Sequence, residues 1–419
     1  MSAELTHTMP ATINRTPIFS LLLASAISNV GNTLTMIALP WFVLETTGSA
    51  AMTGMVGFFV ALPNFIAGIF GGTLVDRFGY KRISIISDLV SGFGVMMVPL
   101  LYLTTGIAFW QLLVFVFIGA LLDIPGLTSR RAMLPELTRQ GGLRLEQVNS
   151  AFESVQFIAL LVGPPLAGVL IGSFGTANVL WINVATFAIS SALVAVAVPS
   201  AAPTVKIAGS RYLDELKAGL RFLRSDRVLF GMAVCVGISN FLSASTFSVL
   251  LPVFVKQEFD SASVFGVMAT AVGVGGVAGA IAFGAWGHRL SRRPLWVTSF
   301  LVAPIELMVF VLTTSLPILL FVLVAVAVVY GPINALMVTI RHERIPAELR
   351  GRVFSTFSAI TAVAAPLGIL LAGYAIEHLG LRETIVLIAS LQLVLALAVI
   401  AYPAFRMLDA TRNATEAAA

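Results

Sequence analysis

The chain has 419 residues and a formal net charge of +5, and 58% of its residues are hydrophobic while only 11% are charged. Soluble domains carry about 25% charged residues, so this composition, with a mean hydropathy of +0.97, excludes a soluble globular protein. Cys235 is the single cysteine and lies in an apolar run, which excludes an intrachain disulfide framework.

Twelve apolar stretches are each long enough to cross a bilayer, which requires about 20 residues. Backbone groups in lipid must be satisfied within the protein, so these stretches are predicted to be helices rather than open strands. The predicted spans are 17–45, 50–75, 83–104, 107–128, 148–173, 176–198, 228–254, 262–287, 294–314, 317–340, 353–376 and 382–405. We therefore predict an all-α membrane protein.

Basic residues predict how the chain is oriented. If the N-terminus is cytoplasmic, all but two of the 25 Lys and Arg residues, Lys256 and Arg382, lie in cytoplasmic segments. This distribution predicts that both termini lie in the cytoplasm, and it places no Lys or Arg inside a predicted span. The excess of arginine over lysine favours a bacterial source and hence the cell (inner) membrane.

Residues 199–227 are predicted to connect an N-terminal lobe (1–198) to a C-terminal lobe with a short cytoplasmic tail (228–419). Within this connection leucines recur at helical spacing among charged residues, at Leu213, Leu216, Leu220 and Leu223. This pattern predicts an amphipathic helix on the cytoplasmic membrane face. A strut between the lobes without a regulatory role is the simplest interpretation of that helix.

The two halves of the chain repeat each other. At a spacing of 212 residues, the pairs are Gly54 and Gly266, Gly72 and Gly284, Arg77 and Arg289, and Lys81 and Arg293. The fourth and tenth spans repeat at a spacing of 211, pairing Asp123 with Asn334, Arg130 with Arg341, and Pro135 with Pro346. A repeat of membrane-spanning units over half a chain is typical of two-lobed secondary transporters.

The loop from Gly72 to Arg82 resembles G-x-L-x-D-R-x-G-x-[KR]-[KR], the cytoplasmic loop signature of the major facilitator superfamily. The resemblance implies a major facilitator fold of 12 transmembrane helices, in two six-helix lobes related by a pseudo-two-fold axis. It also implies that the loop holds the lobes in the outward-facing state. The predicted gating residues are Gly72, Asp76, Arg77, Gly79, Lys81, Arg130 and Arg289. A basic loop that only sets topology is the alternative. The second copy carries His288 for the acid and Ser291 for the glycine, so the gate is expected to be asymmetric.

Two further segments resemble drug exporters. Gly163-Pro164-Pro165-Leu166-Ala167-Gly168 is similar to the G-P-x-x-G-G element of drug:proton antiporters, although a proline-kinked packing helix explains it equally. Residues 122–137 and 38–41 resemble the macrolide-efflux-like, mycobacterial Tap-like multidrug exporter branch. The resemblance implies export of drugs in exchange for protons. Exporters of this branch often carry Gly-Asp in the first span, whereas Asn32 follows Gly31 here.

Four carboxylates fall within the predicted spans, at Asp88, Asp123, Glu153 and Glu306. With no basic residue in any span they lack partners, and such a charge costs roughly 2.5–3.5 kcal/mol at a helix centre unless a proton neutralises it. Glu153, one turn from Gln156, is the favoured proton carrier, with a structural hydrogen bond as the alternative. Asp123 is expected to pair with Arg or Lys from the loop after the second span. Glu306 is third, because the family architecture puts its helix, like that of Asp88, outside the central cavity.

Amides and aromatic residues on central helices predict the substrate cavity, although a packing role explains each aromatic alone. The predicted lining residues are Asn32, Trp41, Asn64, Gln156, Asn240, Phe241, Tyr330 and Asn334. Such a lining suits a bulky amphipathic substrate rather than a sugar or an inorganic ion.

We therefore predict a proton-coupled exporter of lipophilic or amphipathic drugs that lies in the lipid bilayer, acts as a monomer and needs no cofactor or metal. Export of an endogenous siderophore or lipid-like metabolite is the alternative within transport. An intramembrane enzyme, an ATP-driven pump and a nucleic-acid partner are disfavoured, because the spans carry no Ser/His or His-cluster pattern and the chain has no P-loop. A non-transporting sensor is disfavoured by the absence of a predicted soluble domain.

Overall fold

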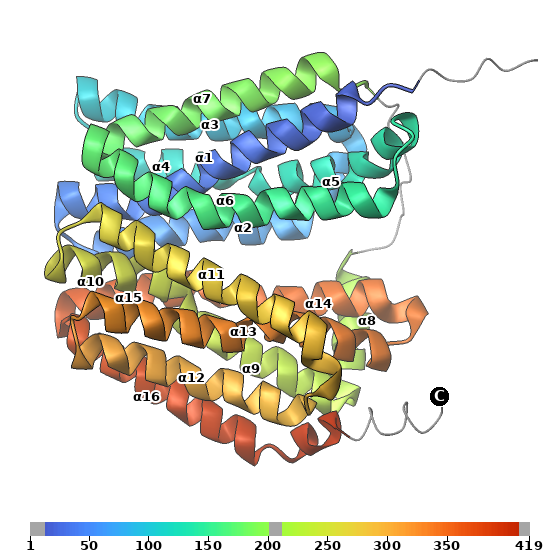
Figure 1. The fold of residues 1–419 in the computed structure, drawn as a ribbon, viewed down its shortest axis with the longest axis vertical. Helices are drawn as coiled ribbons and strands as arrows, with labels where there is room; N and C mark the ends of the chain where they lie inside the picture. The colour runs from blue at the N-terminus through green and yellow to red at the C-terminus, as the bar shows by residue number, and fades with distance from the viewer. Residues whose placement is uncertain (1–12, 201–211, 410–419) are drawn as a thin grey trace, which may run out of the picture.

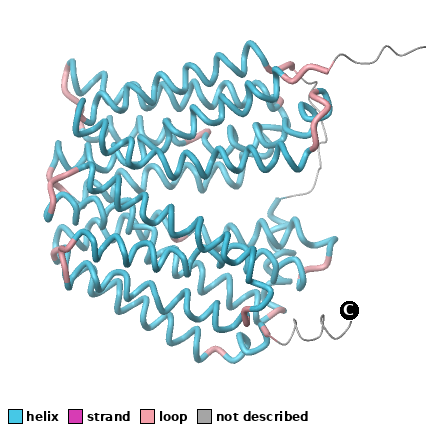
Figure 2. The backbone as a smooth tube through the Cα atoms, viewed as in Figure 1, coloured by secondary structure: helices cyan, strands magenta, loops and turns pink. Residues whose placement is uncertain are grey.

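The computed structural model describes residues 13–200 and 212–409, and within them it describes side chains except at 68–77, 212–215 and 288. The described chain is helical apart from short connections and contains no strand. Twelve stretches are long and apolar enough to cross a membrane, which confirms the predicted fold class. Most loops gather at the two ends of the bundle (Figure 2).

The helices form two lobes, the first drawn blue to green and the second yellow to red in Figure 1. The first lobe consists of α1 Thr16–Thr47, α2 Ala50–Phe78, α3 Tyr80–Thr104, α4 Phe109–Ala120, α5 Asp123–Gln140, α6 Leu145–Phe174 and α7 Thr176–Ala197. The second consists of α9 Arg227–Ser245, η1 Thr246–Leu250, α10 Leu251–Glu258, α11 Ala262–Trp286, η2 Gly287–Arg289, α12 Arg292–Leu312, α13 Leu316–Arg344, η3 Ala347–Leu349, α14 Arg350–Val363, α15 Ala365–Leu379, α16 Leu381–Ala401 and η4 Pro403–Leu408. We call the side of the bundle at which α1 begins the terminal side, and the other side the far side.

Prolines interrupt the helical geometry of three spans. A proline lacks the N–H that a helix needs, and its ring displaces the carbonyl four residues earlier. Pro125 accordingly follows the break between α4 and α5, and Pro366 follows the break between α14 and α15. Pro252 follows η1, a short π-helix in the seventh span. The first of these breaks matters most for the site, because it makes Asp123 the first residue of α5.

The fourth span is longer than predicted, because α5 continues to Gln140 rather than stopping near residue 128. The residues after Pro125 are polar on average, so the apolar run ends there. The helix continues because its buried side chains recur at helical spacing, as at Met133, Leu134 and Leu137. Consequently Arg130 and Arg131 lie on a span-forming helix.

Helix α8, Tyr212–Ser225, precedes the second lobe and packs against α14. Gly219 lets the two helices approach, because a Cβ there would lie 2.2 Å from the hydroxyl oxygen of Thr356. Leu223 is fully buried in the apolar core of the second lobe. The described part of the connecting segment is therefore attached to the second lobe.

The two lobes meet at the far side, where α2 packs against α15 and α6 against α11. Both contacts need glycine. A Cβ on Gly54 would lie 2.9 Å from the Cα of Gly373, and one on Gly266 would lie 2.3 Å from the carbonyl oxygen of Pro164. Gly54 and Gly266 are partners in the sequence repeat, so the repeat places equivalent glycines in both interfaces.

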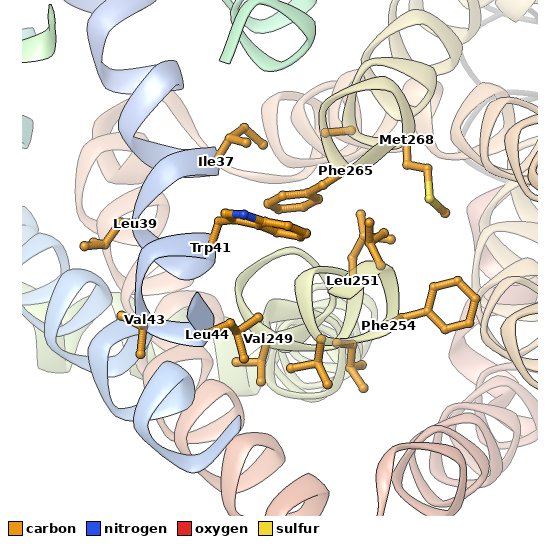
Figure 3. Packing of buried hydrophobic residues seen from close by; sticks show 14 of the residues in the cluster. Ile37, Leu39, Trp41, Val43, Leu44, Val249, Leu251, Phe254, Phe265 and Met268 are labelled. Atoms are coloured by element: carbon orange, nitrogen blue, oxygen red, sulfur yellow. The ribbon is translucent and has the colours of Figure 1, made fainter. Parts of the chain in front are cut away.

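Aromatic packing and a capping carboxylate reinforce the far-side contact. Trp41 of α1 stacks on Phe265 of α11 with ring centroids 6.4 Å apart, and both side chains are buried (Figure 3). Glu377 of α15 accepts hydrogen bonds from the Ser49 hydroxyl (3.1 Å) and the Ala51 amide (3.2 Å), at the start of α2. A carboxylate is favourable at a helix N-terminus. These contacts hold the two lobes together at the far side.

Candidate transport and coupling sites

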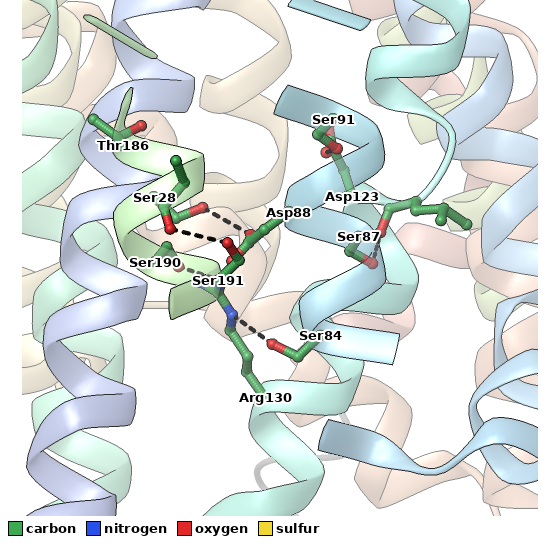
Figure 4. Close-up of polar contacts among 12 residues, drawn as sticks. Ser28, Ser84, Ser87, Asp88, Ser91, Asp123, Arg130, Thr186, Ser190 and Ser191 are labelled. Atoms are coloured by element: carbon green, nitrogen blue, oxygen red, sulfur yellow. Dashed lines mark hydrogen bonds and ion pairs between the residues drawn. The ribbon is translucent and has the colours of Figure 1, made fainter. Parts of the chain in front are cut away.

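The first lobe contains a buried ion pair between α3 and α5. Arg130 Nη2 lies 2.5 Å from Asp88 Oδ2, and each side chain is only 6% exposed. The same nitrogen donates to the Ser190 hydroxyl at 2.7 Å, and Arg130 Nε donates to the Ser84 hydroxyl at 3.1 Å (Figure 4). Ser28 donates to the other oxygen of Asp88 at 3.5 Å. The pair therefore ties together α1, α3, α5 and α7.

The prediction that no span contains Lys or Arg, and that the span carboxylates are unpaired, is wrong for Asp88 and Glu153. The long helix α5 supplies both partners. Arg130 faces the lobe interior, while Arg131 pairs with Glu153 of α6 at 3.0 Å, and these two side chains are about half exposed (49% and 50%). Glu153, the favoured proton carrier, therefore has a cationic neighbour and is half exposed.

Asp123 lies at the helix break and has a different environment. Its carboxylate accepts a hydrogen bond from Ser91 at 3.0 Å, and no cation pairs with it among the described side chains. The expected partner is an Arg or Lys of the loop after the second span; the side chain of Arg77 is not described, and Lys81 donates to the carbonyl of Ala195 instead. Nearby, Ser87 donates to the carbonyl of Leu122 at 2.8 Å and so satisfies an acceptor at the break. Asp123 is the first residue of α5, where the free N–H groups of the helix favour a negative charge.

Asp123 also lies between two hollows of the first lobe. A polar pocket of about 40 Å³ contains Asp123 together with the Asp88–Arg130 pair. A cavity of about 390 Å³, which we call the first-lobe cavity, reaches from Asp123 to the second lobe at Phe247 and Ile369. Its lining is mainly apolar, with polar groups at Asn32, Thr35, Asn64, Asp123, Asn183 and Ser248. This cavity has the size of drug-binding sites, which are about 300–1,000 Å³.

The second lobe contains a cavity of about 400 Å³, which we call the second-lobe cavity. It lies between α9, α12, α13 and α14, and its polar residues include Asn240, Tyr330, Asn334 and Arg341. Asn240 donates to the carbonyl of Thr361 at 2.7 Å. Five of the eight predicted lining residues therefore line a cavity, two in the first lobe and three in the second.

Three predicted lining residues contact neither cavity. Trp41 donates from its indole nitrogen to Glu45 at 2.8 Å and belongs to the far-side interface. Phe241 packs against the apolar core at the same interface. Gln156 has a buried amide nitrogen without a hydrogen-bond partner in the described part of the chain.

Glu306 of α12 is partly buried, and no hydrogen bond or ion pair involves it among the described residues. It contacts neither cavity as bounded above. Its environment is therefore that of a carboxyl group packed between helices. Within the described residues, no three His, Cys, Asp or Glu side chains are grouped so that they could hold a metal ion.

The motif on the fifth span lies at an interface. A Cβ on Gly163 would come within 2.5 Å of the Thr33 side chain, so this glycine allows α1 and α6 to touch. Gly168 faces α11 across the lobe boundary, where its carbonyl accepts a hydrogen bond from Ser263 at 3.1 Å. Pro164 contributes the carbonyl that Gly266 approaches. The motif thus supplies the close contact between α6 and α11.

The predicted gating loop is described only in part. The side chains of Asp76 and Arg77, and the surroundings of Gly72, lie outside the described set. Gly79 has φ = 83° and forms the turn between α2 and α3, for which glycine is suited. Lys81 donates to the carbonyl of Ala195 at 2.8 Å and so joins α3 to α7. Arg289 is exposed in η2, and Arg130 belongs to the buried ion pair instead.

Comparisons with known proteins agree with this architecture. The chain is 31% identical over 402 residues to the multidrug efflux pump Tap of Mycolicibacterium fortuitum, covering 94% of this chain and 98% of that protein. It is 24% identical over 382 residues to macrolide efflux protein A of Streptococcus pyogenes, covering 89% and 92%. The crystal structure of the nucleoside transporter NupG covers 92% of this chain and 98% of its own, with a TM-score of 0.75 at 14% identity. A bacterial homologue of ferroportin, in an inward-facing state, gives a TM-score of 0.69 at 17% identity, covering 92% and 98%. These two solved structures show the fold alone.

Residues 10–418 match the family described as transmembrane secretion effector. With this match, the Tap relative and the twelve-span fold, the chain is a multi-pass membrane transporter rather than an enzyme, and it belongs to the transmembrane secretion effector family of major facilitator proteins.

Proposed function

We propose that this transporter exports lipophilic or amphipathic drugs across a bacterial inner membrane by alternating access. The relatives named as multidrug and macrolide efflux proteins support the direction and the substrate class. The observation that carries the proposal is the first-lobe cavity, which is mainly apolar, drug-sized and bounded by both lobes.

The terminal side is proposed to face the cytoplasm, with both chain termini there. The support is the distribution of Lys and Arg, because cytoplasmic loops carry an excess of these residues. With this orientation the far-side contact closes the path to the outside. The lobes would then part at the far side to release substrate, acting as a single chain within the bilayer.

We assign proton coupling to Asp123. Asp123 is partly buried and has no cationic partner among the described side chains. A carboxylate in such surroundings is costly in the membrane, and uptake of a proton removes that cost. Asp88 does not meet this condition because Arg130 pairs with it, and Glu153 does not because it is half exposed beside Arg131. Asp123 also touches the first-lobe cavity, so a bound substrate and a bound proton would compete for the same space.

Glu306 is the second candidate for the proton, because it too has no cationic partner among the described residues. Its position away from the first-lobe cavity makes direct competition with substrate impossible there. For the gating loop we retain the predicted role of Gly72, Asp76, Arg77, Gly79 and Lys81, with Arg289 in the second lobe. Arg130 is assigned to the lobe interior instead.

Accumulation of a fluorescent lipophilic cation in cells that lack their own efflux pumps tests the export function. Expression of the chain should lower accumulation, and Ala61→Phe, which places a ring in the first-lobe cavity, should abolish that effect. Met52→Phe on the same helix is the matched control, because Met52 lies outside the cavity and is partly exposed. Unchanged accumulation of every lipophilic drug tested would refute drug export and favour an endogenous siderophore or lipid-like metabolite.

A further inference from the structure

The polar pocket of the first lobe and the second-lobe cavity are built from equivalent residues. At the same spacing of 211 residues, six residues of the pocket correspond to six residues that line the second-lobe cavity. These pairs are Ser25 and Val236, Ser28 and Ser239, Asn29 and Asn240, Asp123 and Asn334, Gly126 and Met337, and Arg130 and Arg341. Asp88 lies on α3, which repeats in α12 at a spacing of 212, so it corresponds to Phe300, which also lines the second-lobe cavity. The repeat therefore relates two sites as well as two folds.

The charges of the two sites differ. In the first lobe the arginine is accompanied by two acids, Asp88 and Asp123, and it pairs with Asp88 at 2.5 Å. In the second lobe both acids are replaced by neutral residues, Phe300 and Asn334, while the arginine remains. In the first-lobe pocket, acids of the same pocket therefore neutralise the charge of Arg130. In the second-lobe cavity, Arg341 carries a positive charge and no described lining residue is an acid.

Arg341 is held in place without a carboxylate. Its Nε donates to the carbonyl of Met337 at 3.2 Å, and its guanidinium carbon lies 4.7 Å from the ring centre of Phe357 and 4.9 Å from that of Phe354. No acid pairs with it among the residues that the structure describes. Aromatic faces orient a guanidinium and leave its terminal nitrogens free to form bidentate hydrogen bonds to an anion.

The cavity has room for a ligand beside this charge. Its volume is about 400 Å³, against about 40 Å³ for the first-lobe pocket that the ion pair fills. Tyr330 lies three helical turns from Arg341 along α13, or about 16 Å at 1.5 Å per residue. Phe300, Ile333 and Met337 are among the apolar residues that line the same cavity. The cavity therefore offers one cationic end and a longer body in which apolar side chains alternate with hydroxyl and amide groups.

We infer that the second-lobe cavity binds the acidic group, a carboxylate or a phosphate, of an amphipathic molecule, with Arg341 as the anion-binding residue. The inference rests on the proposed export function and deepens it by assigning the chain a class of substrate that carries a single acidic group. A transported drug and an anionic lipid both present this chemistry, so the experiment has to separate them.

The test compares the binding of two dyes to the purified full chain in neutral detergent, followed by fluorescence polarisation. One dye is a rhodamine with a free carboxylate, and the other is the methyl ester of the same rhodamine. The wild type should bind the acid more tightly than the ester. Arg341→Gln should weaken binding of the acid by roughly 10- to 100-fold, the range for one hydrogen bond to a charged group, and leave the ester unchanged.

Ser299→Asp provides the opposite perturbation, because it adds an acid to the lining that Ser299 shares with Arg341. It keeps Arg341 but gives it an internal partner, so the preference for the acid should also disappear. Arg341→Lys should retain part of the preference, and Arg406→Gln, which removes an exposed charge outside the cavity, should retain all of it. Retained binding of the ester shows in each variant that the protein is folded.

Equal binding of the acid and the ester by the wild type would overturn the inference, as would a preference that survives both Arg341→Gln and Ser299→Asp. Displacement of the acid by phosphatidylglycerol but not by phosphatidylcholine would support the anion site and identify its occupant as a lipid headgroup. Binding is measured without a gradient or cells. A chain that exports drugs without this preference would refute only the inference, and a chain that shows the preference without export would refute only the export function.

Discussion

A side chain added at Gly266 would collide with the backbone of α6, whereas one added at Gly276 on the same helix would meet no atom within 4 Å. A Cβ there would lie 2.3 Å from the carbonyl oxygen of Pro164 and 3.0 Å from its carbon. Real Cβ atoms essentially never approach other heavy atoms closer than 3.0 Å, and the obstacle is backbone that cannot rotate away. Gly266→Ala should therefore force the two helices apart at the far side.

This cost changes the equilibrium between two arrangements of the lobes, the one described here, in which they touch at the far side, and one in which they have parted there. Inserting a carbon into a well-packed contact costs roughly 1–3 kcal/mol. The α6–α11 contact at this position is lost when the lobes part at the far side, so the cost falls on the arrangement described here. A change of that size shifts the ratio of the two arrangements by about 5- to 150-fold.

Distances between spin labels on the terminal side measure this ratio. Glu146 and Glu348 are exposed on different lobes at that side, and each can carry a label in a Cys235→Ala background. Gly266→Ala should move the distance distribution towards shorter values, as the terminal side closes. The control is Gly276→Ala on the same helix, where a Cβ meets no atom within 4 Å. Identical distributions for Gly266→Ala and the parent protein, or equal shifts in both glycine variants, would refute the reasoning.

Three further perturbations test the remaining contacts. Arg130→Gln leaves the Asp88 carboxylate buried without its cation, so it should lower the stability by about 3–5 kcal/mol in thermal unfolding, and adding Asp88→Asn should recover part of the loss. A double variant no more stable than Arg130→Gln would contradict that assignment. Glu377→Gln removes a charge at the start of α2, worth about 0.3–1 kcal/mol, and should shift the ratio of the two lobe arrangements in the same direction as Gly266→Ala, by no more than about fivefold. A shift towards longer terminal-side distances would count against it. Glu153→Gln breaks an exposed pair with Arg131 and should leave drug-driven proton movement within about fivefold of wild type, since such pairs contribute about 0–1 kcal/mol, whereas complete loss would move the proton site to α6.

The twelve helices could be predicted from the sequence because each is an apolar run longer than a soluble core requires. The end of the fourth span could not. Hydropathy falls after Pro125, although α5 continues to Gln140 on a narrow stripe of buried side chains. Arg130 consequently looked like a loop residue, and its pairing with Asp88 was missed. The repeat of Asp123 and Arg130 with Asn334 and Arg341 was a signal that both arginines lie on helices.

The residues that line the cavities were predictable only in part. Asn64 and Asn334 are amides in apolar helices, which are costly unless they line a cavity or find a partner, and both do line cavities. Aromatic residues carry no such cost. Trp41 therefore could not be assigned from the sequence to a cavity or to an interface, and the structure places it against Phe265. Which side chains meet across helices depends on packing that a single sequence does not report.

Drug-driven proton movement in proteoliposomes tests the central claim most directly, with an imposed pH gradient and Asp123→Asn compared with wild type. The substitution reproduces the amide found at Asn334 and keeps an acceptor for Ser91, while it removes the titratable group. Addition of drug should dissipate the gradient in wild type and fail to do so in Asp123→Asn, although the variant still binds drug. Dissipation that persists in Asp123→Asn, or drug transport by wild type that leaves the gradient unchanged, would contradict proton-coupled export through Asp123.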